Sequence, residues 1–375
     1  MKKILICASR VSHILNFHLP YLQYFKSQGY EVHIAVQGST DDPLIDRCFD
    51  LHFTKNPLSP DNIGTIFRLK KIIQNGNYSI IYSNTTLAGV AVRAALMLLS
   101  GTKPYYVHIC HGYIFSEKND FTQKMILACE RMTKSPVQHL VVMNREDYDL
   151  AKKYRLGKIL HYISGMGLCP EKFPPVSNSE RQRIRQSLGA DDHTRILLCI
   201  GEFSARKNQK VLIEVFDRLL KNHRDLILVF AGEGGCLEDC RRLAERYELG
   251  GKVRFLGYRE DINLLCRSAD LLLSASKMEG MPFNVMEALY CGLPCVLSDV
   301  KGHRDLAEDG GIVLFDKDRP DDIYRQINAV LSSPSVYQKL LSTVGLNEKY
   351  LLKNVQPELL PVLDREYSQK ERVSV

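Results

Sequence analysis

The sequence lacks an apolar run long enough to cross a membrane. Its most apolar stretch, residues 88–100, contains Arg93 and falls short of the roughly 20 residues that a membrane-spanning helix needs. The apolar run that starts at Ile4 is interrupted at Arg10, which indicates a first β-strand rather than a secretion signal. We therefore expect a cytoplasmic protein that is either soluble or peripheral to a membrane.

Long runs of one charge are also absent. The chain has 50 Lys and Arg against 43 Asp and Glu, a net charge of +7, and these residues are spread along its 375 positions. A dedicated nucleic-acid-binding protein usually concentrates its positive charge on one face or arm. We therefore predict no nucleic-acid partner. The modest surplus suits anionic small ligands or an acidic membrane surface equally well.

Disulfide and metal-binding patterns are missing as well. The 11 cysteines are odd in number and follow no secretory leader, which argues against a disulfide framework. The pairs Cys236/Cys240 and Cys291/Cys295 lack the two further ligands that a zinc site would need. The sequence therefore predicts no metal and no cofactor.

Short apolar runs alternate with longer amphipathic segments in both halves of the chain. The runs show no period-2 alternation, which is typical of parallel strands buried on both faces. Strand–helix alternation in each half predicts an α/β protein of two doubly wound, Rossmann-like domains. The predicted strands are 4–8, 32–36, 80–83, 105–110, 140–143 and 160–163, then 196–201, 226–231, 253–256, 271–275, 295–298 and 312–315.

A Gly- and Pro-rich stretch at residues 165–178 indicates the boundary between the domains. We place an N-terminal domain at 1–168, a linker at 169–188 and a C-terminal domain at 189–354. A last helix at about 355–370 could pack back on the N-terminal domain.

Polar and glycine residues follow the predicted C-terminal strands, where open parallel sheets bind ligands. Arg206 and Lys207 follow the first strand and suit a diphosphate, although a solvated helix start would look the same. Gly232, Glu233 and Gly234 follow the second strand. Glycine permits close approach of the backbone to a ligand, although any tight turn also favours glycine.

Residues 274–289 carry the strongest signal. Pro282 fits the first position of a helix whose leading amides would be available to an anion. Glu279 and Glu287 offer carboxylates that accept hydrogen bonds from sugar or ribose hydroxyls. The alternative is that both are ordinary solvent-exposed helix residues.

The pattern Glu279-x7-Glu287 within EGMPFNVMEALYCGLPCVLSDVKGHRDL resembles the signature of retaining glycosyltransferases of family 4. GEFSARKN, AGEG, VRFLGYREDI and ADLLLSASKMEG resemble other blocks of that family in order and spacing, and HICHGYIF resembles its bacterial exopolysaccharide and capsule members. The resemblance implies a GT-B fold, with two Rossmann-like domains facing each other across a cleft, and no bound metal. The Asp pairs at 41–42, 191–192 and 321–322 fit solvated turns.

The resemblance also implies roles for individual residues. Arg206 and Lys207 would hold the donor diphosphate, Glu279 the donor sugar, and Glu287 the ribose. The remaining donor-binding candidates are Tyr258 and Arg259 beside the base, the Gly232, Glu233 and Gly234 turn, and Gly280, Met281, Pro282, Phe283 and Asn284 around the sugar. His111 would lie near the reacting sugar, and Ser12 and His13 on the acceptor side. Many relatives carry Arg where this chain has Glu202.

The expected activity is metal-independent transfer, with retention, from a UDP-hexose or UDP-N-acetylhexosamine. The acceptor would be a saccharide on polyprenyl diphosphate, in capsule or exopolysaccharide synthesis at the inner face of the cell membrane. An anionic membrane surface is the further expected partner, because basic residues follow the apolar Phe121, Met125, Ile126 and Leu127. They are Lys124, Arg131, Lys134, Arg145, Lys152, Lys153, Arg155 and Lys158. Two alternatives remain: a nucleotide-sugar epimerase, and a catalytically silent nucleotide-sugar-binding subunit, which Glu202 favours.

Overall fold

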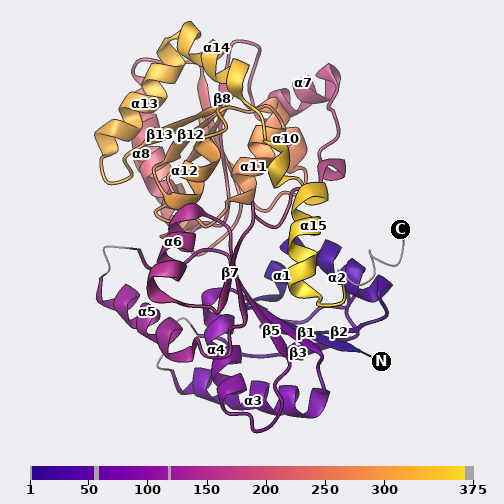
Figure 1. The fold of residues 1–375 in the computed structure, drawn as a ribbon. Helices are drawn as coiled ribbons and strands as arrows, with labels where there is room; N and C mark the ends of the chain where they lie inside the picture. The colour runs from indigo at the N-terminus through magenta and orange to yellow at the C-terminus, as the bar shows by residue number, and fades with distance from the viewer. Residues whose placement is uncertain (1, 55–58, 117–119, 368–375) are drawn as a thin grey trace. The chain divides into compact units, whose positions relative to one another are not determined.

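The computed structural model describes residues 2–54, 59–116 and 120–367 and contains two compact units (Figure 1). Unit 1 comprises Met1–Gly167 and Leu352–Val375, and unit 2 comprises Leu168–Leu351. Each unit has one parallel sheet accompanied by helices. This confirms the predicted class of two doubly wound α/β domains.

The sheet of unit 1 has seven strands in the order β3-β2-β1-β4-β5-β6-β7, all parallel. The order reverses between β1 and β4, which brings the carboxyl ends of β1, β4 and β5 together at one edge. The strands are β1 Lys3–Cys7, β2 Glu31–Val36, β3 Arg47–Asp50, β4 Ile80–Asn84, β5 Tyr105–Cys110, β6 His139–Val142 and β7 Ile159–Tyr162. The helices are α1 Val11–Phe17, α2 Leu19–Ser27, α3 Pro60–Gly76, α4 Thr86–Met97, α5 Phe121–Thr133, α6 Arg145–Tyr154 and α15 Leu352–Leu363.

A buried ion pair joins α4 to α5 in unit 1. Arg93 Nη1 lies 2.7 Å from Glu130 Oε2, and both side chains are fully buried. Arg93 also donates from Nε to the Gly89 carbonyl oxygen at 3.0 Å. The charge that interrupts the apolar run 88–100 is therefore accommodated inside a folded domain. No helix among the described residues is both long and apolar enough to span a bilayer.

Unit 2 has six parallel strands in the order β10-β9-β8-β11-β12-β13, and each overlaps a predicted range. They are β8 Arg195–Ile200, β9 Leu226–Ala231, β10 Val253–Phe255, β11 Leu271–Ser274, β12 Cys295–Ser298 and β13 Ile312–Phe315. The helices are α7 Asn178–Ser187, α8 Gln209–Leu220, α9 Leu237–Arg246, α10 Ile262–Ser268, α11 Phe283–Tyr290, α12 Lys301–Ala307, α13 Pro320–Ser332 and α14 Pro334–Thr343, with 3₁₀ turns η1 Pro170–Lys172 and η2 Glu348–Tyr350.

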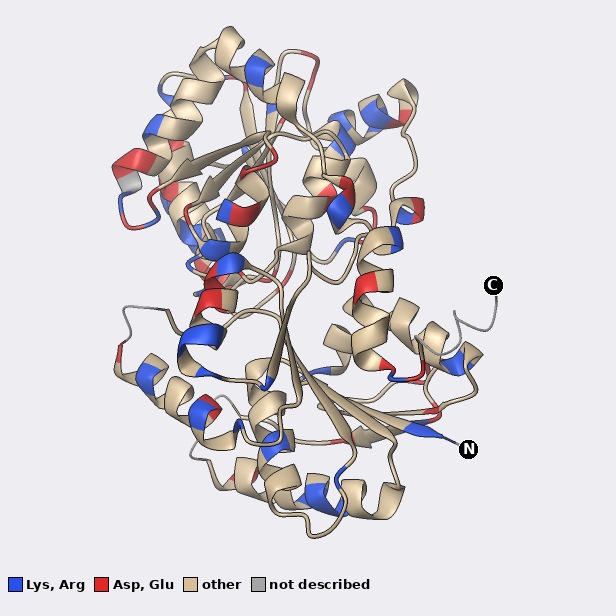
Figure 2. Ribbon diagram, viewed as in Figure 1, with Lys and Arg blue, Asp and Glu red and all other residues tan. Residues whose placement is uncertain are grey.

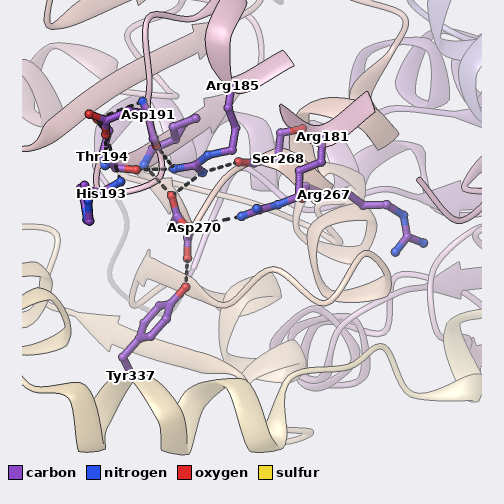
Figure 3. Close-up of polar contacts among 10 residues, drawn as sticks. Arg181, Arg185, Asp191, His193, Thr194, Arg267, Ser268, Asp270 and Tyr337 are labelled. Atoms are coloured by element: carbon purple, nitrogen blue, oxygen red, sulfur yellow. Dashed lines mark hydrogen bonds and ion pairs between the residues drawn. The ribbon is translucent and has the colours of Figure 1, made fainter. Parts of the chain in front are cut away.

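The predicted linker, residues 169–188, belongs to unit 2 and contains helix α7. Ser177 and Glu180 cap the helix reciprocally, and Arg185 on its last turn is buried. The Arg185 guanidinium donates to Ser268 O at 2.9 Å and Asp270 Oδ2 at 3.0 Å (Figure 3). The Gly- and Pro-rich composition marked the chain's entry into unit 2, whereas this buried arginine anchors the helix that follows.

The C-terminal helix α15 belongs to unit 1, where Figure 1 shows it beside α1 and α2. Tyr105 on β5 donates to the Val362 carbonyl oxygen at 2.7 Å, and Tyr24 on α2 donates to Asp364 Oδ2 at 3.0 Å. The helix ends at Leu363, earlier than the predicted residue 370. Residues 368–375 lie outside the described part of the chain.

Candidate active site

The loops after β8, β9 and β10 of unit 2 are joined by backbone hydrogen bonds. Gly232 N donates to Gly257 O at 2.7 Å, and Phe203 N donates to Glu233 O at 2.8 Å. Gly232 has φ +147°, and a Cβ there would lie 2.1 Å from the Gly201 carbonyl oxygen. Gly234 is equally constrained, because its Cβ would lie 2.4 Å from Phe203 O. Packing between loops therefore explains these glycines; a direct contact with ligand stays a prediction.

One buried carboxylate holds both predicted phosphate-binding cations. Lys207 Nζ lies 2.7 Å from Glu279 Oε1, and Arg206 Nη1 lies 3.1 Å from Glu279 Oε2. Arg206 Nη1 also donates to the Met278 carbonyl oxygen at 3.0 Å. Residues that the sequence placed in two separate motifs thus form one group where the β8 and β11 loops meet, and we call Arg206, Lys207 and Glu279 the charged triad.

The charged triad combines an ionised acceptor with two donors. Burial raises the pKa of Glu279, but Lys207 and Arg206 together outweigh it and lower the pKa to about 2. Glu279 is 7% exposed, whereas the Arg206 side chain is 42% exposed. The group can therefore offer a carboxylate to hydroxyls and cations to phosphate oxygens at the same place.

Helix α11 begins one residue later than predicted. Pro282 is its N-cap with extended φ and ψ, not its first helical residue. Met281 and Pro282 are buried, and Phe283 and Asn284 are partly exposed. Asn284 Nδ2 donates to the Ile200 carbonyl oxygen at 2.9 Å, so its amide fastens α11 to the end of β8. A role of Asn284 in donor binding stays a prediction.

Glu287 lies on α11 with an unusual environment for a carboxyl group. Burial raises its pKa to about 7, and the positive charge of Lys172 opposes this only in part. Among the described residues, its carboxylate forms no hydrogen bond or ion pair. Its oxygens therefore remain able to accept hydrogen bonds from a ligand hydroxyl.

The two residues predicted to flank the base, Tyr258 and Arg259, differ in how free their side chains are to contact a ligand. The Tyr258 side chain is 67% exposed after β10. Arg259 instead pairs with Asp261, with Nε 2.7 Å from Oδ1. Of the two, Tyr258 is the more accessible surface for a base.

Sequence reasoning missed His303 on α12. Its ring is fully buried, and Nδ1 donates to the Ser298 carbonyl oxygen at 2.8 Å. Burial lowers the pKa of His303 to about 4, although the Glu279 charge acts in the opposite direction. The residue lay inside the block DVKGHRDL that carried the resemblance, but nothing in the spacing linked it to Glu279.

α12 also packs tightly against the loop that carries Glu279. Gly302 N donates to the Glu279 carbonyl oxygen at 3.3 Å. A Cβ at Gly302 would lie 2.2 Å from Gly280 O. The absence of a side chain at this position therefore lets the two segments meet.

The unit 1 candidates lie at the carboxyl edge of its sheet. His111 follows β5, and its Nε2 lies 3.2 Å from Asn84 Oδ1 at the end of β4. Ser12 and His13 lie on α1. The rings of His13 and His111 meet edge to face with centroids 4.3 Å apart. Burial lowers the pKa of His13 to about 4 and that of His111 well below 6.5.

Comparison with known proteins matches both units to glycosyltransferase families. Residues 21–163 match the family described as Glycosyltransferase Family 4, and residues 180–343 match Glycosyl transferases group 1. Among solved structures, HepE of Anabaena in complex with UDP and glucose has a TM-score of 0.78 at 17% identity, covering 97% of this chain and 99% of that one. This likeness confirms the GT-B fold class.

Two relatives illustrate the biochemical context. The Bacillus subtilis protein EpsD, whose name assigns it provisionally to the glycosyltransferases, is 36% identical over 313 residues, 82% of each chain. The Escherichia coli UDP-Gal:alpha-D-GlcNAc-diphosphoundecaprenol alpha-1,3-galactosyltransferase is 24% identical, covering 71% of this chain and 69% of the relative. The chain therefore belongs to the GT-B glycosyltransferases, related to the exopolysaccharide and lipid-linked saccharide transferases, with a family 4 domain followed by a group 1 domain.

Proposed function

We propose that the protein transfers a hexosyl or N-acetylhexosaminyl group from a UDP-sugar, with retention, to a saccharide carried on polyprenyl diphosphate. The observation that carries this proposal is the charged triad, because it joins two cations to a sugar-compatible carboxylate. The E. coli relative supports the choice of substrates, since its name specifies a UDP-sugar donor and a diphosphoundecaprenol-linked acceptor. The proposed pathway is capsule or exopolysaccharide synthesis.

The chemistry follows from the charges of the triad. Lys207 and Arg206 bind the diphosphate and neutralise the negative charge that grows on it as the bond to the anomeric carbon breaks. Glu279 accepts hydrogen bonds from donor-sugar hydroxyls and orients the ring, with the backbone of Gly280 and Phe283 alongside. Because two side chains supply positive charge, the diphosphate needs no bound metal ion.

The acceptor hydroxyl attacks the anomeric carbon from the face that the diphosphate leaves. The new C–O bond forms as the bond to the phosphate oxygen breaks, and the departing phosphate takes the hydroxyl proton. Glu287 binds the ribose hydroxyls and Tyr258 covers the base. We assign Ser12 and His13 of unit 1 to the acceptor side and His111 to the reacting sugar.

UDP release tests the proposal. The purified chain is assayed with a panel of nucleotide sugars and a lipid-diphosphate sugar acceptor. We expect Glu279→Ala and Lys207→Ala each to lower kcat/KM about 10²–10³-fold, the cost of removing one group that stabilises transition-state charge. Lys210→Ala is the matched control, because Lys210 lies one turn further on and is exposed.

The same assay separates the alternatives. An epimerase would convert the UDP-sugar without any acceptor, and a silent subunit would bind the donor but release no UDP with any acceptor. Near-normal activity in both folded triad variants would overturn the site assignment.

We further propose that α5 docks the protein on the inner face of the cell membrane. Phe121 and Met132 are 77% and 74% exposed, and Lys124 and Arg131 on the same helix are exposed. Leu127, predicted for the membrane face, is instead packed in the core of unit 1. Lys and Arg are distributed over both units (Figure 2), so docking relies on combining apolar and basic groups rather than on net charge.

A further inference from the structure

Three histidines that are distant in sequence converge in unit 1. His13 lies on α1, His18 joins α1 to α2, and His111 follows β5. Each offers a ring nitrogen, and these nitrogens all lie within 4.8 Å of one another. The ring centroids are 4.3 Å apart for His13–His111, 5.3 Å for His13–His18 and 5.6 Å for His18–His111.

The interior of this cluster contains polar atoms without partners. The His18 ring is fully buried, and neither of its nitrogens has a hydrogen-bond partner within the described residues. His13 Nε2 is also buried without a partner there. Burying a polar atom without a hydrogen-bond partner is unfavourable, so several such atoms close to one another call for a ligand.

Asn84 sets the orientation of the third ring. Its Nδ2 donates to the Cys7 carbonyl oxygen at 3.4 Å, which leaves Oδ1 facing His111 Nε2 at 3.2 Å. Because Oδ1 can only accept, His111 carries its proton on Nε2 and keeps a lone pair on Nδ1. A hydrogen bond from the outer nitrogen to an oxygen is the usual way in which a metal-binding histidine is oriented.

We propose that His13, His18 and His111 bind a divalent transition-metal ion, with Zn²⁺ the best fit. Imidazole nitrogens suit zinc, and three histidines with one open position make a recurrent zinc site. Bonds of about 2.0–2.1 Å in a tetrahedral site place the nitrogens about 3.4 Å apart, so ion binding draws the rings together by up to about 1.4 Å.

The partial exposure of His13 and His111 provides access for the ion and for a fourth ligand such as water. The site lies at the carboxyl edge of the unit 1 sheet. It does not depend on the proposed function, because metal binding is measured directly.

Zinc binding to the full-length chain tests the proposal. The protein is stripped with a chelator and titrated with Zn²⁺ by calorimetry, and the bound ion is examined by X-ray absorption. We expect one tight equivalent with nitrogen or oxygen neighbours at about 2.0–2.1 Å. Sulfur neighbours at about 2.3 Å would instead show that cysteines bind the ion, and would overturn the proposal. A lack of saturable zinc binding would also overturn it.

Variants assign the ligands. His13→Ala, at a partly exposed position, should abolish tight binding, and Asn84→Ala should weaken it about 10–100-fold through loss of the orienting hydrogen bond. His139→Ala is the matched control, because His139 contacts only one other histidine, His161, at 2.9 Å among the described residues. Equal zinc affinity in His13→Ala and His139→Ala would refute the site even if the wild-type chain binds zinc.

Discussion

Replacing Glu287 with glutamine should stabilise the protein at alkaline pH. The Glu287 side chain is half-buried on α11, and partial burial raises the pKa of its carboxyl group from 4.5 to about 7. Glutamine has nearly the same shape and carries no charge. The variant therefore removes the cost of ionising a half-buried acid while leaving the packing of unit 2 intact.

The size of the effect follows from the two pKa values. At 1.36 kcal/mol for each tenfold change in proton affinity, the change from 4.5 to about 7 corresponds to about 3 kcal/mol. Below pH 4.5 the group is protonated in both folded and unfolded chains, so it costs nothing. Between pH 4.5 and 7 only the folded state holds the proton, so stability falls as pH rises, and above pH 7 the full cost applies.

Thermal unfolding of the ligand-free protein at a series of pH values measures this cost. At pH 8 we expect Glu287→Gln to raise Tm by about 6–12 °C, from about 2–4 °C for each kcal/mol in a domain of this size. At pH 4.5 the difference should vanish. Glu260→Gln serves as control, because that side chain is exposed in the same unit. A Tm difference that does not vary with pH, or a less stable variant at pH 8, would refute the reasoning.

Further predictions concern the site, the fold and the membrane. Gly302→Ala should weaken UDP binding more than tenfold in calorimetry, because a Cβ at this position would lie 2.2 Å from Gly280 O. Gly235→Ala is the control and should bind UDP normally, since the space around Gly235 is open. Equal UDP affinities of the two variants would contradict the packing argument. Arg185→Ala should destabilise unit 2 by about 3–5 kcal/mol in urea unfolding, since Asp270 loses a buried partner; an unchanged midpoint would show that α7 is not anchored in this way. The wild-type chain should float with anionic vesicles at low salt and Phe121→Glu should not; failure of the wild-type chain to float would exclude docking through α5.

The sequence revealed most of the strands because parallel strands buried on both faces need continuous apolar runs. All six strands of unit 2 could be found in this way. The strand β3 could not, because it lies at the edge of its sheet with Arg47 and Asp50 exposed at its ends. Its short polar sequence resembles a loop, and only pairing with β2 identifies it.

The sequence by itself determined the fold class, the family and the residue types available for donor binding, since apolar periodicity and motif order are local properties of the chain. Tertiary structure alone decided which of those residues meet. The strand order placed the β8 and β11 loops side by side and so joined Glu279 to Lys207, and it brought His111 to His13 at the edge of the other sheet. Local patterns report how each element is buried, whereas contacts between loops depend on the order in which the strands pair.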